Sequence, residues 1–203
     1  DQHVTATPVD PPGQEKILPS QDKEGNKVVN GLMRGVIERP VAVFKQRTHH
    51  LVQLNEDCLA KMENIIFIRN PKQIISSYAQ IRPDVNILDI GIEKQCQLFE
   101  KLTANNIHCV VLDSNEILKA PEKVLTALCE KLEIPFYKSM LHWSTGPKAE
   151  DGVWAKYWYD NVHKSTGFEK QKTSSRELPE YLETLYIESK NYYDQLYQHS
   201  IKA

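Results

Sequence analysis

A single arginine follows an apolar run at the point where a helix is predicted to begin. Residues 64–68 are apolar or β-branched after Asn64, and Arg69, Asn70 and Pro71 come next. Asn at an N-cap and Pro in the first turn are typical of a helix N-terminus. A cation beside the N–H groups of a helix start is suited to binding a phosphate. A surface ion pair is the other interpretation of Arg69, and the sequence leaves both open.

A second apolar run, residues 41–44, leads into the group Lys45-Gln46-Arg47-Thr48-His49-His50. An imidazole that titrates near neutral pH can act as a general base beside a bound electrophile. A zinc site would need further ligands at matching spacing, and none is evident, so we expect no metal. For each of His49 and His50, a buried structural role is the alternative.

A third candidate is the segment 150–168, which is irregular and rich in aromatic residues. It also carries Lys156, His163 and Lys164. Long loops of this composition are commonly binding loops or lids. An aromatic ring such as that of Trp154 can stack on a purine. A structural clamp that closes the domain is the alternative.

Strands and helices that would position these residues alternate along the chain. Strands are predicted at 41–44, 64–68 and 108–112, and helices at 71–81, 88–104, 121–132 and 178–201. The apolar runs are continuous, as in strands buried on both faces of a parallel sheet. The sequence therefore predicts a three-layer α/β/α fold with a mainly parallel sheet, in a single domain 1–203 whose residues 1–27 are mostly loop.

Composition excludes several classes of function. The chain has 203 residues, 25 Lys and Arg against 27 Asp and Glu, and 8 Gly. The balanced charge argues against a nucleic-acid partner, and no apolar run approaches the roughly 18 residues that span a bilayer. Neither G-x-x-x-x-G-K-[ST] nor G-x-G-x-x-G is present. Four widely spaced cysteines and the absence of a signal peptide lead us to expect a cytoplasmic protein.

The segment from Ile68 to Tyr78 resembles the second nucleotide-binding motif of the sulfotransferases. That motif has a strand ending in Arg, then Asn or Asp, then a helix with Ser eight residues after the Arg. In this family the Arg and Ser hold the 3′-phosphate of 3′-phosphoadenosine 5′-phosphosulfate. The resemblance carries these roles to Arg69 and Ser77.

The segment Arg47-Thr48-His49 is similar to the Lys-Thr-His of cytosolic sulfotransferases, with Arg in place of Lys. The resemblance makes His49 or His50 the catalytic base, and Lys45 is then the local cation. Lys164-Ser165-Thr166-Gly167 resembles the basic loop that closes on the 3′-phosphate.

A narrower resemblance is carried by Met140-Leu141-His142-Trp143 and by residues 150–168. It is to sulfotransferase-like proteins that are also found fused ahead of branched-chain aminotransferase domains in plants. The implied fold is that of the P-loop nucleoside triphosphate hydrolases and sulfotransferases. Its first strand, phosphate loop and helix have no counterpart in the sequence, so we expect them to lie upstream of Asp1.

The implied reaction is transfer of a sulfuryl group from this nucleotide cosubstrate to a hydroxyl or amine of a small-molecule acceptor, without a metal. Two alternatives remain at this point. One is a non-catalytic module that keeps the sulfotransferase fold for interaction or regulation. The other is a P-loop small-molecule kinase, which would need magnesium and ATP.

Overall fold

The chain is described from a computed structural model, which describes residues 27, 29–31, 40–46, 48, 56–80, 84–152, 155–169 and 178–203. It divides into two compact units. The larger unit comprises Val36–Leu141 and Phe168–Ala203, and the smaller unit comprises Asp1–Gly35 and His142–Gly167. Each unit is considered by itself below.

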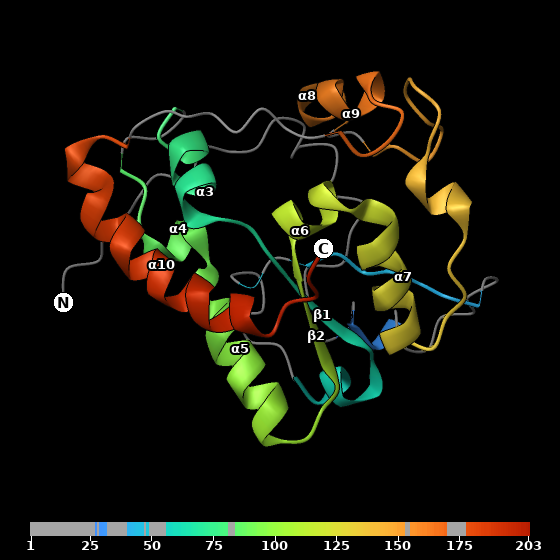
Figure 1. Cartoon of the computed structure of the whole chain (residues 1–203), viewed down its shortest axis with the longest axis horizontal. Helices are drawn as coiled ribbons and strands as arrows, with labels where there is room; N and C mark the ends of the chain where they lie inside the picture. Colours follow the sequence, from blue (N-terminus) through green and yellow to red (C-terminus); the bar gives the residue numbers. More distant parts are fainter. Residues whose placement is uncertain are drawn as a thin grey trace. The chain divides into compact units, whose positions relative to one another are not determined.

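Most of the described helices and strands belong to the larger unit (Figure 1). In chain order these are η2 (Glu56–Lys61), β1 (Asn64–Ile68), α3 (Pro71–Tyr78), α4 (Ile87–Ile90), α5 (Ile92–Ala104), β2 (Cys109–Asp113), α6 (Ser114–Lys119), α7 (Pro121–Lys131), η3 (Lys138–Leu141), η4 (Glu180–Leu182) and α10 (Glu183–Gln198). The smaller unit contains α8 (Ala155–Trp158) and α9 (Asp160–Lys164).

The sheet of the larger unit has two parallel strands within the described residues, β1 and β2. Asn64 lies opposite Cys109, and Ile68 lies opposite Asp113, so the carboxyl ends of both strands meet at one edge. After α10, Ser200 forms a parallel bridge with Val111, and the N–H of Ile201 donates to the Val111 carbonyl at 3.1 Å. The mixed helix-and-strand architecture with a small parallel sheet agrees with the predicted α/β class.

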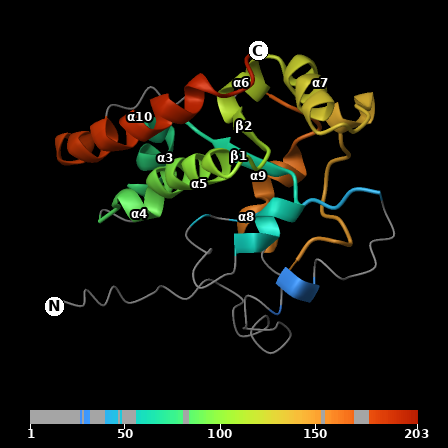
Figure 2. The same cartoon turned by 90° about the horizontal axis from the view of Figure 1, so that it is seen from below.

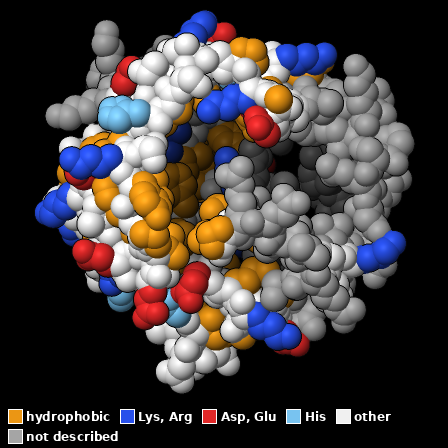
Figure 3. Space-filling model, turned by 90° about the vertical axis from the view of Figure 1, so that its right-hand side faces the viewer, with side chains coloured by type: hydrophobic (Ala, Val, Ile, Leu, Met, Phe, Trp, Pro, Cys, Tyr) orange, Lys and Arg blue, Asp and Glu red, His pale blue; other side chains and the backbone are white. Residues whose placement is uncertain are grey.

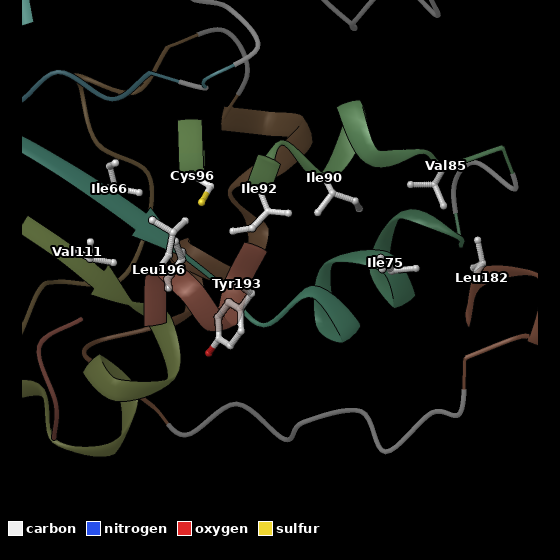
Figure 4. Packing of buried hydrophobic residues seen from close by; sticks show 11 residues of the cluster. Ile66, Ile75, Val85, Ile90, Ile92, Cys96, Val111, Leu182, Tyr193 and Leu196 are labelled. Atoms are coloured by element: carbon white, nitrogen blue, oxygen red, sulfur yellow. The ribbon is translucent and has the colours of Figure 1, made fainter. Parts of the chain in front are cut away.

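One core cluster packs helices α3, α5 and α10 against a face of the sheet (Figure 4). Ile66 and Val111 from the strands point toward Cys96 of α5 and toward Tyr193 and Leu196 of α10. Burial of these apolar side chains is the main source of stability for this packing. Figure 2 shows these three helices together on one side of the strands.

A second cluster lies on the other face of β2, because neighbouring residues of a strand point in opposite directions. Val110 and Leu112 pack there with Ile117 of α6 and Val124 of α7. On the same side of β1, Ile65 and Phe67 are 41% and 53% exposed. Helices therefore cover both faces of β2 and one face of β1 among the described residues. The complete three-layer arrangement stays a prediction.

Two sequence predictions about elements need correction. Residues 41–44 form no strand: the segment 41–46 is irregular and exposed, with Val43 85% exposed. An apolar run becomes a buried strand only where partners cover it, and these side chains are left uncovered. The predicted helix 88–104 is instead two helices, α4 and α5, divided at Gly91.

Gly91 adopts a left-handed conformation with φ 73°, which ends α4 and redirects the chain into α5. Such a φ is costly for residues with a Cβ. The other predicted helices appear with shifted limits. The C-terminal one begins later, with η4 followed by α10, and α6 was missed because its single short stretch shows no full helical period.

Candidate functional site

The start of α3 explains why Asn and Pro follow Arg69. Asn70 is the N-cap: its Oδ1 accepts from the backbone N–H of Lys72 at 3.0 Å, and Pro71 occupies the first turn. The N–H of Gln73 donates to the Asn70 carbonyl at 3.0 Å. These N–H groups are thus satisfied within the turn, contrary to the expectation that they are open to a phosphate. An anion here would be bound by side chains, and the partial positive charge at the helix N-terminus would favour it further.

Gln73 and Ser77 are four residues apart in α3, and Arg69 lies just before the N-cap Asn70. Arg69 Nε donates to Gln73 Oε1 at 3.1 Å. Because residues four apart lie on the same side of a helix, Ser77 follows Gln73 on that side. The Ser77 side chain is exposed. Arg69, which precedes α3, therefore contacts a residue on the side of α3 that carries Ser77.

A second contact links this side of α3 to the end of β2. Gln73 Nε2 donates to Asn115 Oδ1 of α6 at 3.4 Å. Asn115 is held in turn by Asp113, whose Oδ1 accepts the Asn115 N–H at 2.8 Å. Side chains that follow both strands thus meet at the carboxyl edge of the sheet, where ligands bind in open α/β folds.

Asp113 is fully buried at the end of β2 and caps α6. Its Oδ1 also accepts the Glu116 N–H at 3.0 Å, and its Oδ2 accepts from the Tyr193 hydroxyl at 2.9 Å. Burial and the neighbouring Asp113 carboxylate raise the pKa of Tyr193 far above its ordinary value. This contact fastens α10 to the junction of β2 and α6.

Glu116 is a second buried carboxylate in the same place. It accepts from Lys119 Nζ, from the Tyr197 hydroxyl at 2.7 Å and from the Ala203 N–H at 2.9 Å. Burial opposes ionisation, but the hydrogen bonds from Lys119, Ala203 and Tyr197 outweigh it and lower the pKa of Glu116 to about 2. Neither carboxylate was predicted from the sequence. Asp113 and Glu116 are three residues apart, and the tyrosines that bind them, Tyr193 and Tyr197, are four residues apart. These two helical spacings were the available signal.

The segment that carries the predicted base is anchored at Thr48. Thr48 Oγ1 donates to the Gly91 carbonyl at 3.3 Å. A Cβ on Gly91 would lie 3.3 Å from the same oxygen, so glycine also permits this close approach. His49 and His50 lie outside the described residues. Lys45 lies in the exposed segment 41–46, and the structure does not place it on a strand end as predicted.

In the smaller unit, Lys164 and Ser165 end α9. Lys164 Nζ donates to Asp160 Oδ2 at 2.6 Å, and both side chains are exposed. Ser165 Oγ donates to the Val162 carbonyl at 2.7 Å and accepts from Trp143 Nε1 at 2.9 Å. Both residues are thus engaged within their own unit.

The segment 142–167 closes on itself. Gly167 forms an antiparallel bridge with His142, and the Trp143 N–H donates to the Thr166 carbonyl at 3.0 Å. Trp154, assigned to stacking on a purine, lies outside the described residues.

An acid–base pair inside this segment was not singled out from the sequence. His163 Nε2 lies 2.8 Å from Asp151 Oδ2. The backbone N–H of Lys148 donates to the same Asp151 oxygen at 2.8 Å, and this bond and His163 lower the pKa of Asp151. The pair ties the loop 148–151 to α9.

Three observations concern classes of site considered from the sequence. Among the described residues, no group of three or more His, Cys, Asp and Glu side chains is arranged to hold a metal ion. No helix in that part of the chain combines the length and apolar character needed to cross a bilayer. Figure 3 shows acidic and basic side chains interspersed around an apolar area on the face in view, rather than a basic patch.

Comparison with known proteins identifies the class. The chain matches the family model described as "Sulfotransferase domain" over residues 2–184, and it belongs to this family.

Two curated relatives come from Arabidopsis thaliana. The chain is 34% identical over 177 residues to branched-chain-amino-acid aminotransferase-like protein 1, and 32% identical over 177 residues to branched-chain-amino-acid aminotransferase-like protein 2. In each case the match covers 87% of this chain and 32% of the relative. The chain thus spans about a third of these relatives, in agreement with the resemblance to the fused group. No solved structure matches the chain.

Proposed function

We propose that the chain transfers a sulfuryl group from 3′-phosphoadenosine 5′-phosphosulfate to a hydroxyl or amine of a small-molecule acceptor. The chain is a member of the sulfotransferase family, and one observation supports this proposal. Arg69 is hydrogen-bonded to Gln73, which lies on the same side of α3 as Ser77. Sulfotransferases generally use this donor.

Arg69 and Ser77 bind the 3′-phosphate in this proposal. A guanidinium offers several N–H donors to phosphate oxygens, and a serine hydroxyl adds one more. Resemblance extends the nucleotide site to Lys164, Ser165 and Gly167 as a loop that closes on the same phosphate, and to Trp154 as a stacking partner for adenine.

The transfer itself breaks the bond between sulfur and the oxygen that bridges it to the 5′-phosphate. A new bond forms between sulfur and the acceptor oxygen or nitrogen, whose proton passes to His49 or His50. Lys45 neutralises the negative charge that the bridging oxygen gains as it leaves with the phosphate.

Calorimetric titration of the full-length protein with adenosine 3′,5′-bisphosphate tests the proposal. We expect binding without magnesium, and Arg69→Ala should weaken it about ten- to a hundredfold, since a hydrogen bond to a charged group contributes about 1.5–3 kcal/mol. Lys123→Ala, which removes a cation from the exposed side of α7, is the matched control and should bind like wild type.

Each competing function gives a different result. A small-molecule kinase would bind ATP with magnesium and would not distinguish nucleotides by the 3′-phosphate. A non-catalytic module would bind neither nucleotide. Unchanged affinity in Arg69→Ala would remove the basis of the site.

A further inference from the structure

The loop 164–167 follows α9 and pairs with the chain around Trp143. Gly167 forms an antiparallel bridge with His142, and the Trp143 N–H donates to the Thr166 carbonyl at 3.0 Å. These backbone contacts fix the far end of the loop. Backbone pairing of this kind is open to most residue types, so it does not by itself require a tryptophan at position 143.

The side chain of Trp143 adds a contact to the middle of the loop. Its Nε1–H donates to Ser165 Oγ at 2.9 Å, and both residues are half-buried. An indole ring is large and rigid and turns about two bonds, so holding it in place costs little conformational entropy. Trp143 therefore holds the loop at two successive residues, through its backbone at Thr166 and through its ring at Ser165.

The contacts of Ser165 lie within this part of the chain. Its Oγ donates to the Val162 carbonyl at 2.7 Å, and its backbone N–H donates to the same carbonyl at 3.1 Å. A serine hydroxyl has one proton to donate, and here that proton is directed to Val162. Ser165 therefore links Trp143 to the end of α9 and acts as a support of the loop, with neither of its donors directed to a phosphate.

Lys164 is the cation that the proposed function places on the 3′-phosphate. Its Nζ donates to Asp160 Oδ2 at 2.6 Å, and its side chain is 71% exposed. An exposed ion pair of this kind contributes little free energy, so a phosphate can compete for the ammonium group. The contacts of Ser165 fix the backbone next to Lys164, and a loop that is already ordered loses less entropy when it binds.

We infer that Trp143 is a positioning residue for recognition of the 3′-phosphate: by binding Ser165, it holds the loop 164–167 in one conformation, and Lys164 contacts the phosphate from this loop. The inference rests on the proposed function, which assigns the loop to that phosphate. It gives a role to Trp143, to which the resemblance assigns none, and it makes Ser165 a support of the loop.

Calorimetric titrations of the full-length protein with adenosine 3′,5′-bisphosphate and with adenosine 5′-monophosphate test this role. Trp143→Phe keeps an aromatic ring and removes the N–H, so it should weaken binding of the bisphosphate about three- to tenfold. Binding of the monophosphate, which lacks the 3′-phosphate, should change by less than about twofold. A merely structural role would weaken the binding of both nucleotides alike.

A double-mutant cycle distinguishes support of the loop from direct binding. Ser165→Ala should weaken binding of the bisphosphate at least as much as Trp143→Phe does. In the Ser165→Ala background, Trp143→Phe should have little further effect, because both substitutions break the same hydrogen bond. Tyr157→Phe is the matched control: it removes a polar group from a ring of the same unit that is 44% exposed, and it should bind both nucleotides like wild type.

Amide hydrogen exchange tests the physical cause without any nucleotide. The Ser165 N–H is protected by its bond to the Val162 carbonyl. If Trp143 holds the loop in place, Trp143→Phe should speed exchange at this amide about threefold or more, because the loop opens more often. Unchanged exchange at Ser165 would contradict the inference.

The outcomes separate this inference from the proposed function. If wild type prefers the bisphosphate and Trp143→Phe keeps the same preference, the positioning role is refuted and the phosphate site stands. A loss in Ser165→Ala without a loss in Trp143→Phe makes Ser165 itself the ligand and also refutes this role. If wild type binds both nucleotides equally well, the proposed function and this inference fall together.

Discussion

Replacing Glu116 by Gln tests whether the buried carboxylate network stabilises the larger unit. Glu116 faces three donors, Lys119 Nζ, the Tyr197 hydroxyl and the Ala203 N–H, and its side chain is 5% exposed. A glutamine has one acceptor oxygen and adds two donors of its own. At least one of the three donors would lose its acceptor in a buried position, which costs free energy.

The shift in the pKa of Glu116 on folding sets the size of the expected loss in the free energy of unfolding. Its pKa falls from 4.5 to about 2 on folding, and at 1.36 kcal/mol per unit this corresponds to about 3 kcal/mol of stability near neutral pH. Lys119 is 59% exposed, so solvent screens its share of the interaction. We therefore expect Glu116→Gln to lower the free energy of unfolding by about 2 to 3 kcal/mol at pH 7.

The loss should depend on pH in a defined direction. Since folding lowers the pKa of Glu116, its contribution is complete above about pH 4.5 and is lost as the pH falls toward about 2. The difference between wild type and variant should shrink to less than half by pH 3.

Urea unfolding followed by far-ultraviolet circular dichroism at pH 7 and pH 3 measures the stability difference at each pH, because most of the described helices belong to the larger unit. Other carboxyl groups titrate in both proteins and cancel in the difference. Glu130→Gln, on the exposed side of α7, is the control and should stay within about 0.5 kcal/mol of wild type. A Glu116→Gln variant as stable as wild type at pH 7, or a difference that is the same at both pH values, would refute the reasoning.

Two further predictions concern the scaffold of the site. Gly91→Ala should lower the free energy of unfolding by about 1–2 kcal/mol, because φ is 73° and the new Cβ would lie 3.3 Å from Thr48 Oγ1. Urea unfolding at neutral pH measures this change. A variant as stable as wild type would contradict the close approach. Leu196→Ala should lower the free energy of unfolding by about 2–5 kcal/mol, because Leu196 of α10 is fully buried against the sheet. Leu88→Ala, at a position 62% exposed, is the control and should change thermal stability little. Equal effects of the two substitutions would contradict the described core.

Local sequence signals predicted those parts of the fold that depend on nearby residues. The strand at 64–68 and the start of α3 were confirmed, since β-branched residues, an Asn cap and Pro in the first turn act within a few positions. The strand at 41–44 was wrong, because apolar character alone does not supply a partner to pair with. Gly91 was read as part of a helix, since its backbone conformation becomes evident only in three dimensions.

The residues of the candidate site divide in the same way, into those with a local sequence signal and those whose contacts involve distant parts of the chain. Ser77 was assigned through a family resemblance, and its role in phosphate binding stays a prediction. Gln73 and Asn115 were not singled out, because their hydrogen bond joins residues that are 42 positions apart. Buried Asp113 was missed for a similar reason: a carboxylate in an apolar strand is recognisable as a tether only once Tyr193 lies opposite it.

The bridge between His142 and Gly167 has a consequence for the length of the chain between them. Because these two residues are paired, the two ends of the segment 142–167 lie side by side. Loop entropy changes slowly with length once the ends are fixed, by about 0.6 kcal/mol for each doubling. Insertions or deletions inside this segment, away from the residues assigned to the nucleotide, should therefore change the free energy of closing it only slightly.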